Sequence, residues 1–171
     1  ENKLSNIDVS KNGALENLIC SRNNLTTLNL TNNPALENLI CSRNQLTSLD
    51  ITKNVALENL ICTRNLLPTL DISKNISLET VICSRNLITV MDISKNVGLE
   101  NFACNGNQIA VFEITKNSAL KSLNIAMNQL TSLDISKNAA LKDLTCSENK
   151  LKTLNLTSNI TLKSLDCSNN Q

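Results

Sequence analysis

The chain has 171 residues, a net charge of +1 at neutral pH, a hydrophobic content of 41% and only two aromatic residues, both phenylalanines. This balanced charge provides no strong field for nucleic acid or an anionic membrane, and no apolar run approaches the roughly 20 residues of a membrane span. So few aromatic residues are unusual for a globular domain, which uses them to fill irregular core volume.

The sequence repeats every 21 residues from Asp8 onward, and the eighth copy breaks off at the end of the chain. The first two copies read DVSKNGALENLICSRNNLTTL and NLTNNPALENLICSRNQLTSL. Self-similarity at a short fixed period is typical of a solenoid, in which each unit buries its apolar face only by stacking on its neighbours. A thin, uniform core of this kind can be filled by the same leucines in coil after coil.

Each copy contains two similar halves, which are Leu15-x-x-Leu18-x-Cys20 and then Leu25-x-x-Leu28-x-Leu30 in the first copy. The apolar step of two residues in each half predicts a short strand with alternate side chains inward. Every half is followed by an invariant asparagine, which suits a turn and can satisfy buried backbone groups. The asparagines form two columns, the Asn33 ladder (Asn12, Asn33, Asn54, Asn75, Asn96, Asn117, Asn138, Asn159) and the Asn44 ladder (Asn23, Asn44, Asn65, Asn86, Asn107, Asn128, Asn149, Asn170).

The seven cysteines occupy a single column of the repeat, in which Ile125 takes the one remaining place. A position shared by cysteine and isoleucine is a buried apolar position. The odd number of cysteines and their common direction argue against disulfides, and zinc ligation is disfavoured because the chain has no histidine. The column therefore predicts buried free thiols, and it does not indicate the redox compartment.

The pattern L-x-x-L-x-C-x-x-N-x-L-x-x-L-D-L-x-x-N-x-x resembles the leucine-rich repeat, in the nested 21-residue form of bacterial proteins sometimes called IRREKO repeats. The resemblance covers essentially the whole chain. It implies a β-rich solenoid of about eight coils. Since the second half of each copy is strand-like and too short for a helix, we expect two short parallel strands per coil, two sheets back to back, little curvature and little or no helix. Residues 1–171 are expected to form a single solenoid, a segment of a longer array without caps of its own.

The outward positions of the first predicted strand suggest a contact surface on coils one to four. An apolar stripe with a polar rim is the usual mark of an interaction surface. The alternative is that β-branched residues merely stabilise a strand surface and were copied by duplication. The candidate protein-binding residues are the isoleucine column (Ile19, Ile40, Ile61, Ile82), the arginine column (Arg22, Arg43, Arg64, Arg85), Asn38 and Asn59.

The opposite margin of this strand carries the glutamate column (Glu16, Glu37, Glu58, Glu79, Glu100), which changes to Lys121, Lys142 and Lys163 in the later copies. The second predicted strand presents threonines and serines around a column of carboxylates that begins at Asp50. Calcium binding and ice binding by this column are both disfavoured, the first because there is no glycine turn with convergent oxygens and the second because the carboxylates are strongly hydrated.

These observations predict a non-enzymatic protein. No insertion interrupts the repeat to gather catalytic groups in a pocket, so we expect no catalytic residue, no cofactor, no metal and no small-molecule substrate. The resemblance implies a protein-binding scaffold, an interaction or adhesion module that is extracellular or at a bacterial cell surface. The alternative is a structural spacer or a fibre-forming segment that self-associates end to end or sheet to sheet. Neither nucleic acid binding nor membrane insertion is expected.

Overall fold

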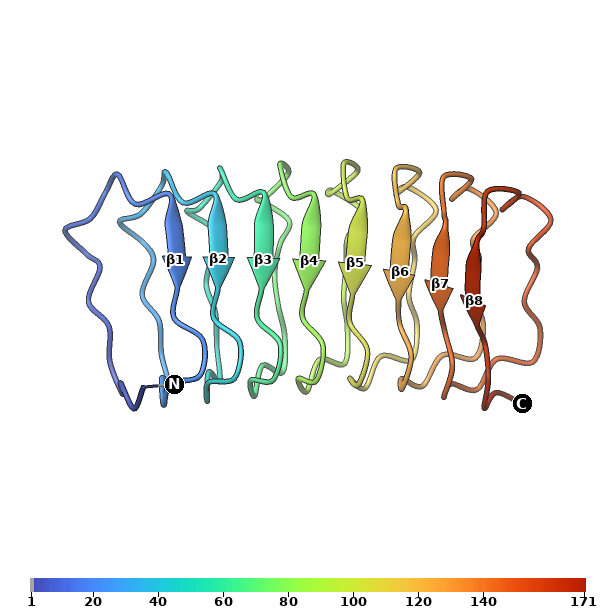
Figure 1. Ribbon diagram of the computed structural model, residues 1–171, viewed down its shortest axis with the longest axis horizontal. Coiled ribbons are helices and arrows are strands. Elements are labelled where there is room, and N and C mark those ends of the chain that lie inside the picture. The colour runs from blue at the N-terminus through green and yellow to red at the C-terminus, as the bar shows by residue number, and fades with distance from the viewer. Residues whose placement is uncertain (1) are drawn as a thin grey trace.

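The computed structural model describes residues 2–171, so residue 1 of the predicted 1–171 solenoid lies outside the described residues. The chain winds into a stack of coils, each 21 residues long (Figure 1). Each coil contributes one strand to an eight-stranded parallel sheet in chain order. The strands are β1 (Asn17–Ile19), β2 (Asn38–Ile40), β3 (Asn59–Ile61), β4 (Thr80–Ile82), β5 (Asn101–Ala103), β6 (Ser122–Asn124), β7 (Asp143–Thr145) and β8 (Ser164–Asp166).

The register of the sheet is the register of the repeat, because each residue pairs with the residue in the same column of the next coil. Asn17 pairs with Asn38, and Ile19 pairs with Ile40. The backbone hydrogen bonds continue beyond the three-residue strands, from the Cys20 N–H to the Ile40 carbonyl and from the Arg22 N–H to the Ser42 carbonyl. The solenoid, the parallel sheet and the absence of helix in the described residues confirm the predicted fold class.

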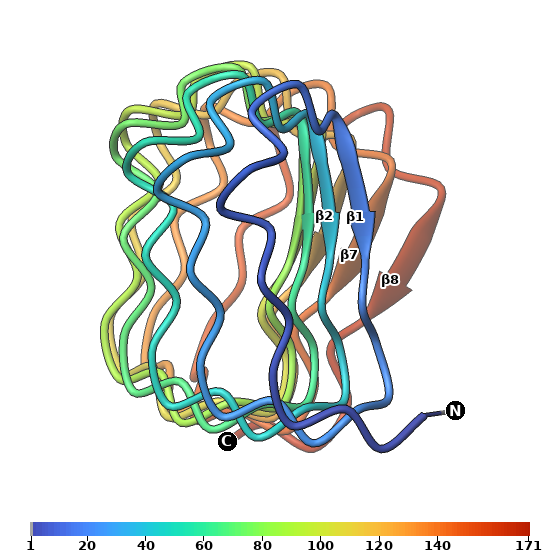
Figure 2. The ribbon, with the colours of Figure 1, turned by 90° about the vertical axis from the view of Figure 1, so that its left-hand side faces the viewer.

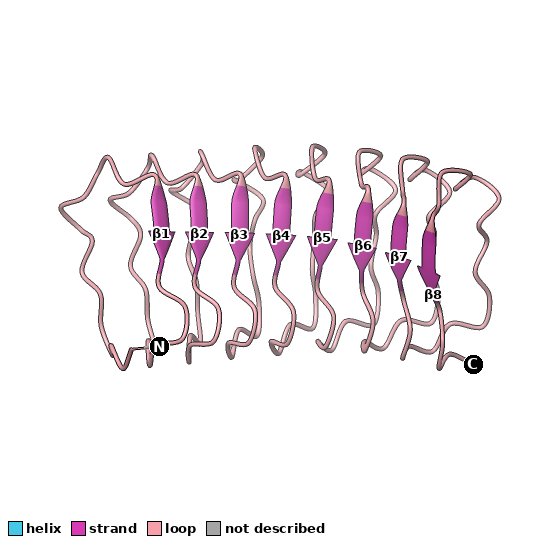
Figure 3. Cartoon of the chain, in the orientation of Figure 1, coloured by secondary structure: helices cyan, strands magenta, loops and turns pink. Residues whose placement is uncertain are grey.

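The second strand predicted for each coil is not formed, and this part of the prediction is wrong: only the first half of each coil is coloured as strand (Figure 3). The expectation of little curvature is wrong as well. Viewed along the array, the middle coils are displaced away from the side of the sheet relative to both ends, so the sheet lines a concave face (Figure 2). On the convex side the coils spread apart, as the segments behind the sheet show in Figure 1.

This curvature explains the missing second sheet, because coils that hydrogen-bond on the concave side are spread apart on the convex side. Convex N–H groups bond within their own coil instead. The Thr52 N–H donates to the Asp50 carboxylate at 2.9 Å, and the Ser73 N–H does the same to Asp71 at 2.9 Å. This short side-chain-to-backbone bond is a local alternative to a ladder. The aspartates of the exposed carboxylate column (Asp50, Asp71, Asp92 and Asp134) therefore shape the turns of their coils.

The core between the two sides contains the predicted leucine, isoleucine and cysteine columns. Leu39, Leu60 and Cys62 are fully buried. Six cysteines are buried and free, as predicted, and the seventh, Cys167 in the last coil, is exposed. In coil five the leucines of two columns are replaced by Phe102 and Phe112, whose rings stack at a centroid distance of 5.4 Å.

Both asparagine ladders are formed and confirm the prediction. In the Asn33 ladder, Asn75 is fully buried and its Nδ2 donates to the carbonyl oxygens of Ile51 (2.9 Å) and Asn54 (2.7 Å). In the Asn44 ladder, Nδ2 of Asn65 donates to the carbonyl oxygens of Cys41 and Cys62, and its Oδ1 accepts the Leu46 N–H. Each ladder thus ties together backbone groups of two successive coils. The Asn33 ladder adds a second donor to carbonyls that already accept a backbone N–H, such as those of Ile51 and Asn54.

The cysteine column leads to a chemical prediction. The thiolate is the reactive form of cysteine, and burial raises the pKa of Cys20 and Cys146 to about 11 and that of Cys83 to about 12. A thiol-alkylating reagent near pH 8 should therefore label Cys167 at least ~100-fold faster than the six buried cysteines. Mass spectrometry of the labelled peptides measures this, with all seven sites reacting in denaturant as the control. Rapid labelling of Cys62 in the folded chain would show that the column is not closed.

Candidate functional site

The isoleucine column lies on the concave face of β1 to β4. Its four members stand directly beside one another, since Ile19 pairs with Ile40, Ile40 with Ile61 and Ile61 with Ile82. Ile19 is 72% exposed because β1 is the edge strand of the sheet, whereas the other three isoleucines have a strand on both sides and are half-buried. The column is therefore a continuous apolar ridge along the solenoid axis.

Asn38 and Asn59 form a polar column beside this ridge. Nδ2 of Asn38 donates to Oδ1 of Asn17 at 2.8 Å, and Nδ2 of Asn59 donates to Oδ1 of Asn38 at 2.8 Å. These side-chain amides are thus held in one orientation across three strands, which lowers the entropy that a partner would have to remove when it binds them.

The arginine column follows the strands at one margin of the concave face, and its backbone is unusual. Arg22, Arg43, Arg64 and Arg85 have φ angles of 58°, 56°, 57° and 54°. This left-handed region is unfavourable for most residues with a Cβ, typically by about 1–2 kcal/mol. In later coils the same place is taken by Gly106, Met127, Glu148 and Asn169, all with a positive φ, and of these only glycine and asparagine tolerate the left-handed region well. The first four coils therefore carry arginine against the local backbone preference.

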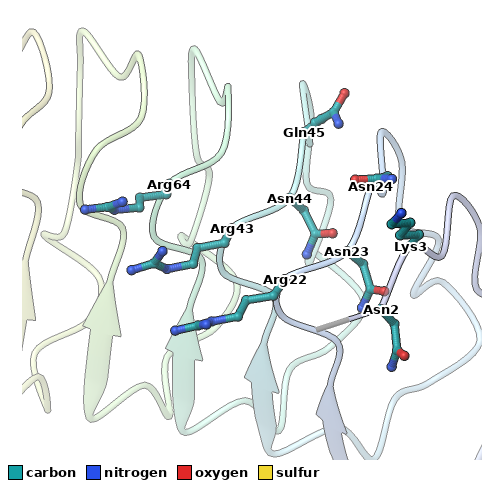
Figure 4. Close-up of a pocket in the computed structure, with 9 residues that line it drawn as sticks. All are labelled: Asn2, Lys3, Arg22, Asn23, Asn24, Arg43, Asn44, Gln45 and Arg64. Atoms are coloured by element: carbon teal, nitrogen blue, oxygen red, sulfur yellow. The ribbon is translucent and has the colours of Figure 1, made fainter.

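The arginine side chains lie parallel to one another. Figure 4 shows Arg22, Arg43 and Arg64 pointing in the same direction along the array, toward the following coils. Like charges at this spacing repel, and the neighbouring Arg43 and Arg85 lower the pKa of Arg64. Over residues 2–171 the one ion pair joins Lys121 to Glu100 at 2.6 Å. Arg43, Arg64 and Arg85 therefore form no ion pair with a carboxylate of the described residues.

An open groove of about 690 Å³ borders the arginine column near the first coils. Its lining residues, shown in Figure 4, are Asn2, Lys3, Asn23, Asn24, Asn44 and Gln45 together with Arg22, Arg43 and Arg64. The sequence analysis did not anticipate this groove or the contribution of Lys3. For the left-handed turns that border the groove a signal was available, because Gly106 and Asn169 stand in the same column as Arg22 and are the residue types that favour such a turn.

The ten predicted site residues thus lie on one face of coils one to four, and whether they bind a partner stays a prediction. The glutamate column lies at the opposite margin, three residues before the isoleucines, as in Glu37-x-x-Ile40-x-x-Arg43. The concave face of these coils is therefore acidic along one margin, apolar along its middle and basic along the other. Sequence analysis identified all three columns but did not place them on a concave surface.

The convex side carries a second apolar feature that the sequence analysis missed. Val90 and Val111 are 70% and 73% exposed, and they border a cavity of about 430 Å³ with Met91 and Ala110. The carboxylate column of this side is engaged in its own turns, and hydrogen bonds from Thr52 hold the pKa of Asp50 below its usual value. Among residues 2–171 no three histidine, cysteine or acidic side chains cluster closely enough to hold a metal ion.

No model of a protein family matches the sequence, and no curated protein matches it either. Among solved structures, the chain is similar to the functional domain of InlJ from Listeria monocytogenes, which includes a cysteine ladder, with a TM-score of 0.97 and 36% identity over 98% of this chain and 38% of that chain. It is also similar to a leucine-rich repeat protein of Leptospira interrogans, with a TM-score of 0.93 and 24% identity over 99% of this chain and 47% of the other.

A plant structure has the same fold. It is the leucine-rich repeat ectodomain of the membrane receptor kinase GASSHO1/SCHENGEN3 from Arabidopsis thaliana in complex with CASPARIAN STRIP INTEGRITY FACTOR 2, with a TM-score of 0.88, 24% identity and coverage of 99% of this chain and 23% of that chain. The present chain therefore spans less than half the length of each of these structures. No helix with the length and apolarity of a membrane span occurs in residues 2–171.

The 21-residue coils and the cysteine column agree with the likeness to InlJ, whose functional domain includes a cysteine ladder. The chain is a leucine-rich repeat solenoid and is similar to bacterial leucine-rich repeat proteins with a 21-residue coil.

Proposed function

We propose that this solenoid is a non-enzymatic scaffold that binds another protein through the concave face of coils one to four. The observation that carries the proposal is the isoleucine column, an apolar ridge stacked in register and bordered by polar and charged columns. An exposed apolar strip with a polar rim is the usual composition of a protein contact. Arginine, which is enriched in binding hot spots, lies beside it.

The likeness to InlJ supports an extracellular or cell-surface location, which is part of the same proposal. The complex of the GASSHO1 ectodomain shows that a leucine-rich repeat array can hold a peptide ligand. Sheet-to-sheet assembly is disfavoured by the shape of the array, because two concave faces laid on each other meet only at their ends (Figure 2). End-to-end assembly stays a prediction.

The proposal is tested by replacing the centre of the ridge. The double variant Ile40→Lys/Ile61→Lys should lower the affinity for the partner at least about thirtyfold, because two charges would be buried in an apolar contact. The measurement is the set of extracellular proteins captured by the immobilised array, followed by titration of the captured protein against wild type and variant.

A matched control is available on the other side of the molecule. The double variant Val90→Lys/Val111→Lys adds the same charges to exposed apolar residues of the convex side and should leave binding unchanged. Circular dichroism verifies that both variants fold. A partner that binds the Ile40/Ile61 variant normally but is lost with the Val90/Val111 variant would move the binding site to the convex side.

A further inference from the structure

The concave face of coils one to four has a spacing and a charge order that select the kind of partner. Successive coils of the sheet are about 4.8 Å apart, so the four arginines span about 14 Å along the solenoid axis. Three turns of an α-helix rise about 16 Å, whereas three two-residue steps of an extended strand cover about 20 Å. A helix parallel to the solenoid axis therefore matches the spacing of the columns more closely than a strand does.

The width of the face also suits a helix. Six residue steps of extended chain lead from each glutamate of the outer margin to the arginine of the same coil, as from Glu58 to Arg64, and they span about 20 Å. A helix with its side chains is about 10–12 Å across. The positions between the isoleucine and arginine columns are small residues, among them Ser42 and Thr63. A helix seated on the isoleucines thus leaves room for long charged side chains on both flanks.

The charge order sets the chemistry of that helix. One margin is acidic at Glu37 and Glu58, and the other is basic at Arg43 and Arg64. The basic margin carries arginines in left-handed turns at successive coils, with no ion pair for Arg43 or Arg64 among the described residues. An acidic stripe of a partner would relieve the repulsion within the arginine column. Nucleic acids and glycans are disfavoured, because this chain has no Trp or Tyr on which bases or sugar rings could stack.

We infer that the concave face of coils one to four binds an amphipathic helix of a partner protein, which lies along the solenoid axis with its apolar stripe on the isoleucine column, its acidic flank on the arginine column and its basic flank on the glutamate column. This inference rests on the proposed function and specifies the partner for the same face. A helix has a direction, and the opposite charges of its flanks fix which way it runs along the array.

Three synthetic helical peptides of roughly 18 residues, about five turns, test this inference by fluorescence anisotropy at low salt. The first has a leucine stripe with glutamates on one flank and lysines on the other. The second has the same leucine stripe with lysines on both flanks. The third has the composition of the first in an order that breaks the helical stripes. Wild-type protein should bind the first peptide at least about tenfold more tightly than the second or third.

The double variant Arg43→Glu/Arg64→Glu should reverse this preference. Both margins of coils two and three become acidic in this variant. The second peptide, with lysines on both flanks, should therefore bind at least about tenfold more tightly than the first. The backbone accommodates the change, since Glu148 has a φ of 54° at the same place in coil seven. The control Lys142→Glu/Lys163→Glu makes the same change in charge in the last two coils and should keep the wild-type preference.

Each outcome decides the inference. Wild type that binds all three peptides equally, or an Arg43/Arg64 variant with the wild-type preference, would overturn it. If a captured partner protein requires Ile40 and Ile61 but binds the Arg43/Arg64 variant normally, the inferred helix contact is wrong while the proposed function stands. If that partner is insensitive to Ile40 and Ile61, the proposed binding face itself is wrong.

Discussion

Replacing Asn75 by aspartate should destabilise the array by at least about 3 kcal/mol, although the two side chains have nearly the same shape. Nδ2 of Asn75 donates to the carbonyl oxygens of Ile51 and Asn54 at 2.9 and 2.7 Å, and the residue has no exposed surface. An oxygen in place of Nδ2 removes both bonds, each worth about 0.5–1.5 kcal/mol. It also brings a lone pair against the two carbonyl oxygens, which already accept the backbone N–H groups of Asn54 and Leu57 and have no donor to offer the new oxygen.

The loss should also depend on pH. Oδ1 of Asn75 has no hydrogen-bond partner among the described residues, so the site offers an anion no donor. Burial raises the pKa of such an aspartate in the folded chain above its unfolded value near 4. The variant should therefore lose stability as the pH rises from about 4 toward neutrality, because only the unfolded chain releases the proton readily.

Urea denaturation followed by circular dichroism measures both effects. Asn12→Asp is the matched control, because Asn12 is the exposed first member of the same ladder, and its loss should stay within about 0.5 kcal/mol. Equal stability of the two variants would mean that the ladder bonds contribute little to the folded state.

Truncating Phe102 to alanine should cost about 3–5 kcal/mol. Its ring is 2% exposed and stacks on Phe112 at 5.4 Å. The neighbouring position of the preceding strand is the smaller Val81, with which Phe102 pairs in register. The large ring therefore fills space next to a smaller neighbour, and its removal would leave a cavity in a core that is thin at every coil.

A double variant separates packing from ring chemistry. Val81→Leu/Phe102→Leu restores leucine, the residue that most coils carry in this column, and the two changes in volume are opposite in sign. Thermal unfolding should place this double variant within about 1.5 kcal/mol of wild type, as for other volume-conserving core changes. A loss as large as that of Phe102→Ala would show that coil five requires the stacked rings themselves.

The repeat made much of the fold predictable, because one residue type per column implies one environment. A column containing Cys20, Cys62 and Ile125 predicts a buried apolar place, and six of the seven thiols are buried. The invariant Asn33 and Asn44 ladders predicted buried amides at two turns, and the hydrogen bonds from Asn54 and Asn65 have that arrangement.

The curvature could not be derived in this way. The curvature depends on the difference in coil-to-coil distance between the concave and the convex side. That difference is a collective property of all coils, and the period-two pattern around Leu28 and Leu30 does not reveal it. The missing second sheet follows from the curvature. The left-handed turns at Arg22 and Arg43 were readable in principle, from Gly106 and Asn169 in the same column. Val90 and Val111 were readable as outward positions of the second predicted strand, but the cavity that they border was not.

Site-specific photo-crosslinking tests the central claim most directly, which is that the concave face of coils one to four holds the partner. A photoreactive residue is introduced either at Thr80, in β4 of the concave sheet, or at Thr89, beside the convex valines. The captured partner should crosslink from Thr80 and not from Thr89. Crosslinking from Thr89 alone, or from neither position with binding intact, would contradict the claim.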